Sequence, residues 1–421
     1  MGGGQSCKID KFSNACEIYK CVEGVIGLKS ESASPSDQWI VKLKNATYDD
    51  TPIEQVFLKY WSESDIKGNT TDAIYALNYE MWTYKHIIYK LRKRKICPNF
   101  IAYLASGKFC TASQINEITK HSNISGKNLI RNIAYMIYHM KNRPAIHTDN
   151  QDDVTQLNKV LPFFSSMRFH MLITEYVDGL SLCTYCRAKP EELELKKILF
   201  QIAVGCYAMN LSKMVHNDMH SFNILLSTNR DELSYYIEGT VYKFKPKYLV
   251  RIFDFDHAYV ERYKHNKDEN RNTLCNGLDM FILIAHLCHF IDNPKNIYLD
   301  VTKLQDYLIK SVLNDTNDSG AVETIKKYYM KHQFDIKADW CNKHIKPTLE
   351  IIKEQGKGFI HARFNECMYH CSADMFDESG RILSEEALKL RAENSNLKRA
   401  TVVGGALSLG TIAAIGMRSR K

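Results

Sequence analysis

The sequence predicts an α+β fold of two lobes around a shared cleft, with a small sheet-plus-helix N-lobe and a mainly helical C-lobe. Two patterns predict this class. The first half contains a strand, a long helix and another strand in succession, and from Leu193 onward the apolar periodicity is mainly helical. The length of 421 residues exceeds one average domain, but two lobes that share a cleft accommodate it without a second independent fold.

The helix of the N-lobe is the most distinct element of the first half. Apolar residues recur at helical spacing from Thr71 to Arg94, and Pro98 ends the pattern. A short strand is expected before it at Gln38–Lys44, and another strand begins after it at Phe100–Leu104. These elements form the middle of the small lobe.

The remaining elements follow from the same periodicities. A polar, Asn-rich stretch over about 111–162 is expected to be an insertion, and it precedes a strand at His170–Thr174. Long apolar helices are expected at Lys196–Leu211 and Leu278–Phe290, and a charged helix at Ser384–Ser395.

These expectations divide the chain into four parts. An N-terminal arm over 1–15 precedes an N-lobe over 16–174, which contains the insertion. A C-lobe over 175–383 is followed by a tail over 384–421 that holds the charged helix and an apolar stretch.

Composition excludes some classes of function. Hydrophobic residues make up 45% and charged residues 25%, so the bulk of the chain should fold. The net charge of +8 is spread along the chain, so no nucleic-acid partner is expected. The 13 Cys residues have no leading secretory signal, which favours reduced, buried thiols in a cytosolic compartment over disulfides or a zinc site.

Both ends of the chain carry possible membrane signals. Met1-Gly-Gly-Gly-Gln-Ser6 fits the pattern for N-myristoylation at Gly2. Val402–Met417 is uncharged and mostly apolar. It is shorter than the roughly 20 apolar residues that a membrane-spanning helix needs. A tilted tail anchor, an interfacial segment and a helix that packs on protein all remain open. Together the acyl group and the apolar tail predict attachment to a membrane surface.

Two acidic motifs carry the residues suited to phosphoryl transfer. His216-Asn-Asp218 is followed five residues later by Asn223, so a carboxylate and an amide oxygen lie on one loop. Asp254-Phe-Asp256 directly follows a strand expected at Leu249–Phe253. Phosphoryl transfer requires cations around the phosphates and a carboxylate aimed at the attacking hydroxyl, and these motifs supply the carboxylates.

The two motifs together resemble the catalytic loop and the metal-binding D-F-G of the protein-kinase superfamily. By that resemblance the enzyme would use ATP and Mg²⁺. Asp218 would accept the substrate proton, Asn223 and Asp254 would bind Mg²⁺, and His216 would be structural. Asp279, at the start of an apolar helix, resembles the buried Asp that anchors the catalytic loop. The resemblance covers roughly 21–289.

The phosphate-contacting Lys is expected to be Lys42, because Trp39-Ile-Val precedes it as apolar residues precede the Lys of V-A-I-K. Lys44 is the alternative. Glu80 on the following helix is expected to orient this Lys, with 51–69 as an extended connection between them.

The other nucleotide contacts are expected on two backbone segments. Gly24 and Gly27 are interpreted as a turn between two strands that approaches the phosphates, a partial match to G-x-G-x-x-G. Ile173–Gly179 resembles the hinge between the lobes, where backbone groups of Glu175 and Val177 would pair with adenine and Thr174 would be the gatekeeper.

Three departures separate the chain from ordinary protein kinases. His220 stands where kinases acting on Ser/Thr commonly have Lys, and Asp256 replaces the Gly of D-F-G, a change also seen in small-molecule phosphotransferases and atypical kinases. Between Asp256 and Asp279 there is no A-P-E, so we expect a site that assembles without phosphorylation of an activation loop.

The motif set looks most like the serine/threonine protein kinases of large cytoplasmic DNA viruses. We therefore expect a kinase that acts on Ser/Thr of proteins and lies in host cytoplasm at a membrane, of a class in which some members are packaged in virions. Two alternatives remain open: a small-molecule phosphotransferase of the aminoglycoside or choline type, and a pseudokinase scaffold at a membrane. Retention of Lys42, Asp218, Asn223 and Asp254 argues against the scaffold.

Overall fold

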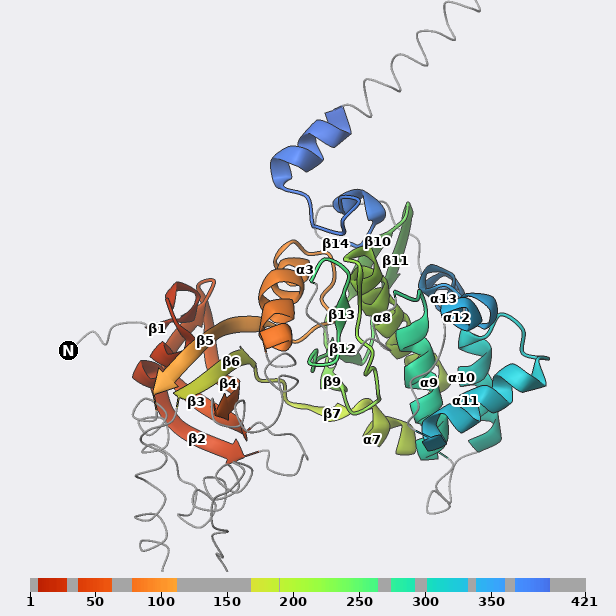
Figure 1. Cartoon of the computed structure of the whole chain (residues 1–421), viewed down its shortest axis with the longest axis horizontal. Helices are drawn as coiled ribbons and strands as arrows, with labels where there is room; N and C mark the ends of the chain where they lie inside the picture. The colour runs from red at the N-terminus through yellow and green to blue at the C-terminus, as the bar shows by residue number, and fades with distance from the viewer. Residues whose placement is uncertain are drawn as a thin grey trace, which may run out of the picture.

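The two lobes lie side by side and are joined through β7 (Gly179–Ser181), as the computed structural model shows (Figure 1). The N-lobe sheet and the C-lobe helices occupy opposite ends of the molecule, as expected for an α+β fold of two lobes. The structure describes residues 7–28, 37–62, 78–111, 168–188, 190–263, 274–291, 301–331, 338–359 and 368–393.

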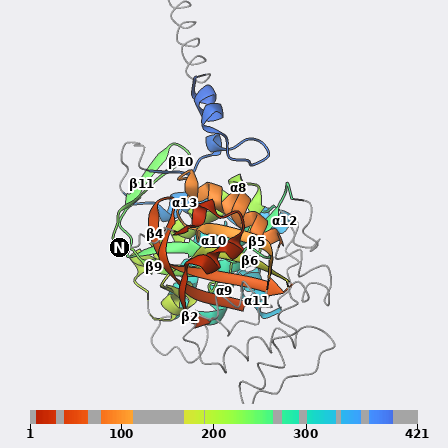
Figure 2. The ribbon, with the colours of Figure 1, turned by 90° about the vertical axis from the view of Figure 1, so that its left-hand side faces the viewer.

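The N-lobe is built on one sheet in the order β1-β3-β4-β6-β5, and β2 also pairs with β3, next to β1. Its strands are β1 (Cys7–Lys8), β2 (Val22–Leu28), β3 (Asp37–Tyr48), β4 (Thr51–Ser62), β5 (Tyr103–Thr111) and β6 (Arg168–Glu175). Seen from this end, the sheet lies in front of the C-lobe (Figure 2). The strands expected at Gln38–Lys44 and His170–Thr174 are confirmed within β3 and β6, and the one expected from Phe100 starts later, at Tyr103.

Strand β4 was not expected, because the sequence analysis treated 51–69 as a connection. It pairs with β3 from Thr51 to Tyr60 with one register shift, and the two-residue turn between them is Asp49-Asp50. Both turn residues have positive φ, 46° and 60°, as a tight hairpin turn requires. Val56 and Leu58 on β4 are fully buried, so this strand is central to the lobe.

One continuous helix over 78–93 packs beside the sheet, and it includes the π-helical turn η3 (Tyr84–Ile88) and α3 (Tyr89–Lys93). Its buried side chains recur at helical spacing and include Tyr84, Ile88 and Leu91. The helix predicted at Thr71–Arg94 is thus confirmed over its described part.

The N-lobe begins before residue 16, contrary to the expected arm over 1–15. The helical turns η1 (Ile9–Lys11) and η2 (Ala15–Cys21) pack on the sheet, where Ile9 and Ile18 are buried. Cys7 and Cys21 form a disulfide, so the prediction of reduced thiols is wrong for this pair. The free cysteines of the described residues are all buried, as expected.

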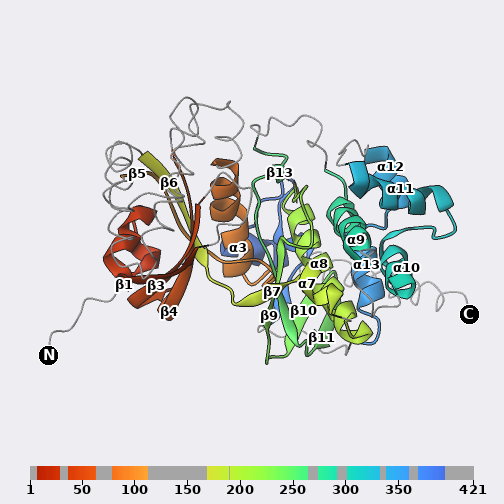
Figure 3. The ribbon, with the colours of Figure 1, turned by 90° about the horizontal axis from the view of Figure 1, so that it is seen from below.

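The C-lobe is mainly helical and centres on α8, which is buried on nearly all sides (Figure 3). Its helices are α7 (Leu182–Arg187), α8 (Glu192–Leu211), α9 (Leu278–Ile291), α10 (Val301–Val312), α11 (Ser319–Lys331), α12 (Ala338–His344) and α13 (Thr348–Gln355). The helices predicted at Lys196–Leu211 and Leu278–Phe290 are confirmed as parts of α8 and α9.

Three small sheets accompany the C-lobe helices, in the orders β12-β9-β7, β13-β8 and β11-β10-β14. Their strands are β8 (Met214–Val215), β9 (Ile224–Thr228), β10 (Leu233–Ile237), β11 (Thr240–Phe244), β12 (Tyr248–Ile252), β13 (Tyr259–Val260) and β14 (Tyr369–His370). Strands β9 and β12 pair antiparallel, which brings the two acidic motifs to the same end of that sheet.

The segment after residue 368 contacts both lobes. Strand β14 pairs in parallel with β10, and the turn η5 (Ala373–Met375) follows. The N-H of His370 donates to the carbonyl of Lys95 at 2.8 Å, and the Arg94 guanidinium donates to the carbonyl of Leu383 at 3.3 Å. A helix over 385–393 confirms the predicted charged helix over its described part.

Several expectations fall outside the described residues: Gly2, the body of the 111–162 insertion, and the apolar stretch Val402–Met417. Within the described ranges, every helix is too short or too polar to cross a bilayer.

Candidate functional site

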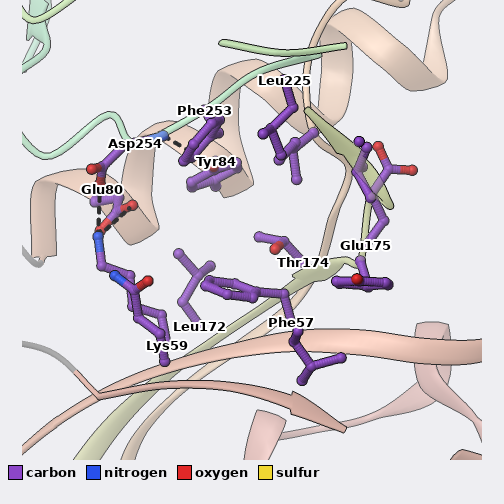
Figure 4. A pocket seen from close by; sticks show the side chains of 16 residues that line it. Phe57, Lys59, Glu80, Tyr84, Leu172, Thr174, Glu175, Leu225, Phe253 and Asp254 are labelled. Carbon is purple, nitrogen blue, oxygen red and sulfur yellow. Dashed lines mark hydrogen bonds and ion pairs between the residues drawn. The ribbon is translucent and has the colours of Figure 1, made fainter. Parts of the chain in front are cut away.

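A pocket of about 330 Å³ lies between the lobes and combines an apolar interior with a charged end. Phe57 and Leu172 from the N-lobe sheet face Leu225 and Phe253 from the C-lobe side (Figure 4). The charged end is formed around Lys59. Its size and mixed lining are typical of small-molecule sites.

Three side chains from distant parts of the chain meet at the charged end. Nζ of Lys59 on β4 lies 2.9 Å from Oε2 of Glu80 and 2.7 Å from Oδ1 of Asp254, as the dashed lines in Figure 4 show. The side chains of Lys59 and Glu80 are only 8% and 2% exposed, whereas that of Asp254 is 30% exposed. The lysine is therefore a fixed cation at the wall of the cleft.

Burial and mutual attraction set the charge state of this group. Burial works to raise the pKa of Asp254, but the Lys59 ammonium outweighs it and the pKa lies below its usual value. Burial likewise works to lower the pKa of Lys59, but Asp254 and Glu80 hold it well above its usual value. Lysine and aspartate are both charged near neutral pH.

The prediction that Lys42 is the cleft lysine is wrong. Lys42 is half exposed and forms an ion pair with Glu23 at 2.8 Å. On the hairpin, Gln38 of β3 stands opposite Lys59, and Lys42 stands opposite Gln55, four residues farther along each strand. Four residues of strand span roughly 13 Å, so Lys42 does not reach Glu80.

A signal for Lys59 was present in the sequence. Val56-Phe-Leu58 precedes Lys59 as the apolar residues of V-A-I-K precede their lysine, and Glu80 follows after 21 positions rather than 38. It was missed because 51–69 had been interpreted as a connection. The position predicted for Glu80, on the helix facing a strand lysine, is confirmed.

Asp254 is held at the turn that follows β12. The N-H of Phe253 donates to the carbonyl of Asn223 at 3.2 Å, which joins the two acidic motifs. Asp254 has a positive φ of 69°, and its N-H donates to the hydroxyl of Tyr84 at 3.4 Å. The backbone thus turns so that the carboxylate meets Lys59.

The catalytic-loop motif is fixed by hydrogen bonds to a buried anchor. The carboxylate of Asp279 on α9 accepts from the N-H groups of His216 and Asn217 at 2.9 to 3.1 Å. Nδ2 of Asn223 donates to the carbonyl of Asp218 at 3.0 Å and to its Oδ2 at 3.3 Å. The anchoring position expected for Asp279 is confirmed, and Asp218 and Asn223 lie in contact.

A column of aromatic side chains connects the helix over 78–93 with this loop. The rings of Tyr84 and Phe255 lie 5.0 Å apart, and those of Phe255 and His216 lie 4.9 Å apart. Nε2 of His216 lies 2.9 Å from the carbonyl of Phe253, so this nitrogen carries the proton and donates. Burial lowers the pKa of His216, as suits a structural imidazole.

Asn217 was not singled out from the sequence, yet it ties the loop to the segment after Asp256. Its φ is 61°, and its Nδ2 donates to the carbonyl of His257 at 3.3 Å. The contact joins the two motifs directly. Assembly without activation-loop phosphorylation stays a prediction, since 264–273 lies outside the described residues.

Two of the three departures from ordinary kinases, His220 and Asp256, are described by the structure. Nε2 of His220 lies 3.4 Å from Oδ2 of Asp218. Burial lowers the pKa of His220, although Asp254 and Asp256 oppose the shift. Burial and the nearby Asp254 raise the pKa of Asp256, whose Oδ1 is buried without a hydrogen-bond partner.

The expected hinge residues line the pocket. Glu175, Val177 and the buried Thr174 all contribute to its wall. The Glu175 carboxylate has a structural role. It forms an ion pair with Arg92 and accepts a hydrogen bond from the N-H of Ala102 at 2.9 Å. Pairing of the backbone with adenine stays a prediction.

Gly24 and Gly27 do not form the turn between two strands that was expected. Gly24 and Gly27 lie inside β2 and pair with Lys42 and Ile40 of β3, with register shifts after Val22 and after Val25. Glycine inside a strand commonly marks such irregularities. The connection over 29–36, which follows β2, lies outside the described residues.

The donor set fits a hard divalent cation bound together with phosphates. Asp254 and Asn223 supply carboxylate and amide oxygens, and the buried Oδ1 of Asp256 has no donor of its own. Among the described residues no three His, Cys, Asp or Glu side chains are grouped to hold a metal ion alone. Mg²⁺ typically completes its shell with substrate phosphates and water, so this arrangement is suitable.

Comparisons with known proteins agree with this geometry. The family model "Protein tyrosine and serine/threonine kinase" matches residues 150–275. "Probable kinase 098L" of Invertebrate iridescent virus 3 is 26% identical over an alignment that covers 35% of this chain and 32% of the viral protein. The chain thus spans about a third of the length of the curated relative it matches.

Proposed function

We propose, on the premise that this chain has a protein-kinase-like fold and resembles a viral kinase, that it transfers the γ-phosphate of ATP to Ser or Thr of proteins. One observation carries the proposal: the Lys59–Glu80–Asp254 ion-pair network is joined to the hydrogen-bonded pair Asp218 and Asn223, because the N-H of Phe253, next to Asp254, donates to the carbonyl of Asn223. A fixed cation and a positioned carboxylate are what phosphoryl transfer requires of a protein.

Asp218 is assigned the role of base. Its carboxylate is oriented by Nδ2 of Asn223, and its loop is fixed through Asp279. A carboxylate held in this way accepts the proton of a hydroxyl as the phosphorus–oxygen bond forms. Nε2 of His220 at 3.4 Å from Asp218 adds a polar neighbour to the same carboxylate.

Lys59 is assigned the contact with the phosphates, and Glu80 keeps its ammonium directed into the cleft. Asp254 and Asn223 would hold Mg²⁺, which when bound neutralises phosphate charge. The apolar walls from Phe57, Leu172 and Leu225 would enclose the adenine ring and exclude water from it.

The choice of Ser/Thr over Tyr follows from the resemblance in the catalytic loop and is the finer part of the proposal. A protein substrate is favoured over a small molecule because the sequence of the later helices has no dense acidic cluster of the kind that binds cationic small substrates. Phosphoamino-acid analysis of a labelled substrate separates the hydroxyl types, because phosphotyrosine as the main product would overturn the assignment.

The decisive experiment offers labelled ATP and Mg²⁺ with a protein mixture and, separately, with a panel of small alcohols and amines. Wild type is expected to label Ser and Thr of proteins, and Asp218→Asn is expected to lower transfer by about 10³-fold. Asp231→Asn, at an exposed turn remote from the cleft, is the matched control and keeps wild-type activity.

Each other outcome selects an alternative. Label on small molecules alone indicates an aminoglycoside- or choline-type phosphotransferase. ATP binding without any transfer indicates a pseudokinase scaffold. Equal activity in Asp218→Asn and wild type would remove Asp218 from the role of base.

Attachment to a membrane is a separate proposal that rests on the apolar stretch 402–417. Flotation with lipid vesicles tests it with wild type, Gly2→Ala and a chain that ends at Lys398. Loss of flotation in the shortened chain supports the tail, and loss in Gly2→Ala supports the acyl group. Flotation of none of the three contradicts both.

A further inference from the structure

Asp256 presents a carboxylate oxygen that lacks a hydrogen-bond partner inside the site. Its Oδ1 is buried, and Nε2 of the neighbouring His257 lies 4.0 Å away, beyond hydrogen-bond distance. The side chain as a whole is 31% exposed, so it is not sealed in the core. A buried anionic oxygen without a donor is costly unless a cation joins it.

The charges around Asp256 indicate what kind of partner is missing. Lys59 is already shared by Glu80 and Asp254, at 2.9 and 2.7 Å. Three carboxyl groups, those of Glu80, Asp254 and Asp256, interact electrostatically with Lys59, and Asp256 also interacts with Asp254. A bound triphosphate adds more negative charge, so the arrangement requires additional cations.

We propose that Asp256 is a ligand of a divalent cation that binds together with ATP, in addition to Asp254 and Asn223. The inference rests on the proposed phosphotransferase function and extends it to a position where the resembled kinases have glycine. Carboxylate and amide oxygens are the ligands that Mg²⁺ prefers. Oδ1 of Asp254 is already paired with the ammonium of Lys59. The carboxylate of Asp256, two residues later, therefore supplies a further negative charge for the cation.

In the described residues, no three side chains of His, Cys, Asp or Glu are grouped to hold a metal ion. This limits the affinity that the site would have for the cation in the absence of ATP. Protein groups alone would hold the cation weakly, and the nucleotide phosphates would complete its shell. Metal affinity should therefore be measured with a non-hydrolysable ATP analogue present. Mn²⁺ is a suitable probe, because its electron paramagnetic resonance signal reports the free ion directly.

The experiment titrates Mn²⁺ into the full chain saturated with that analogue. Asp256→Asn keeps the size of the side chain and removes its charge, and Asp256→Gly restores the residue usual in the family. Both variants are expected to weaken Mn²⁺ binding by about tenfold or to lose one bound ion. Asp231→Asn, an exposed carboxylate remote from the cleft, is expected to bind Mn²⁺ as wild type does.

Wild-type Mn²⁺ affinity and stoichiometry in both Asp256 variants would overturn the proposal. Equal weakening in Asp231→Asn would also overturn it, because the effect would then reflect overall charge. Thermal melts of the free proteins verify that each variant is folded, and the glycine variant remains available if the asparagine variant is not. Since the readout is metal binding, the result is independent of whether wild type transfers phosphate.

Discussion

The two halves of the cleft are held together by different kinds of interaction. On the catalytic-loop side, neighbouring residues are fixed by hydrogen bonds from backbone N-H groups to Asp279, and Asn223 contacts Asp218 within the same loop. On the nucleotide side, Lys59, Glu80 and Asp254 come from a strand, a helix and a turn far apart in sequence. One half is local and backbone-fixed, and the other is long-range and electrostatic.

This difference predicts how a substitution in each half affects activity and stability. Loss of a charge on the nucleotide side should remove chemistry and cost some stability, because buried charges lose their partner. The packing of β4 and the helix over 78–93 should remain, because both are packed through other residues. Loss of the anchor on the catalytic-loop side should damage the fold and the chemistry together, because buried N-H groups would lose their acceptor.

Among the changes that test this difference, the largest expected effect is that of Lys59→Met. Removal of the buried ammonium should lower kcat/KM for ATP by roughly 10²- to 10³-fold, since a positioned cation on the phosphates is lost. The matched control is Lys42→Met, which removes an exposed lysine paired with Glu23 and should change kcat/KM less than about twofold. Steady-state kinetics with a peptide or protein substrate measures both. A larger loss in Lys42→Met than in Lys59→Met would reverse the assignment.

The next effect is on stability, through Asp279→Ala. The N-H groups of His216 and Asn217 would stay buried without an acceptor, at a cost of about 3 kcal/mol in the free energy of unfolding. Urea denaturation followed by fluorescence gives this value. Asp279→Asn retains one acceptor oxygen and should lose less. Equal stability of the alanine variant and wild type would show that the loop is held by other contacts.

A smaller effect is expected at the hinge from Gly179→Ala. A Cβ at this position would lie 2.6 Å from the backbone carbonyl oxygen of Leu226, so β7 must shift. Because Gly179 lines the pocket, KM for ATP should rise several-fold, with about 1 to 2 kcal/mol of lost stability. Gly320→Ala is the control, because its Cβ would meet just one side-chain oxygen, at 3.2 Å. Unchanged KM in Gly179→Ala would exclude the hinge from nucleotide binding.

The smallest effect concerns His220. Burial lowers its pKa, so its proton leaves at a lower pH than usual and the ring is neutral above pH 7. His220→Gln, also neutral, should therefore change kcat by less than about threefold between pH 7 and 8. His220→Lys adds a cation beside Asp218 and should raise kcat a few-fold. A fall in wild-type activity from pH 7 to 8 that His220→Gln abolishes would show a charged imidazole instead.

The same contrast explains what could be predicted from the sequence. Asp218, Asn223 and Asp254 belong to short motifs that stand at the ends of the paired strands β9 and β12, so local pattern was sufficient to place them. The choice between Lys42 and Lys59 depended on which strand of the hairpin faces Glu80, and this is set by long-range pairing. Periodicity found the long helices because they are buried along regular stripes.

Other features had no local signal at all. The disulfide between Cys7 and Cys21 depends on how the N-terminal turns pack, which the spacing of cysteines does not specify. The tie from Asn217 to the carbonyl of His257 requires a positive φ at a residue between two recognised motif positions. Both features arise from tertiary structure rather than from composition or periodicity.

The parallel pairing of β14 with β10 also constrains how the protein is made. Tyr236 leaves the ribosome long before its partner His370 has been synthesised. Lys95 is synthesised earlier still, and its carbonyl accepts a hydrogen bond from the N-H of the same histidine. During translation the C-lobe sheet therefore lacks an edge strand that the finished protein supplies from its own later sequence. The last steps of domain assembly must follow the synthesis of residue 370, so a nascent chain already carrying both acidic motifs is not yet complete as a fold.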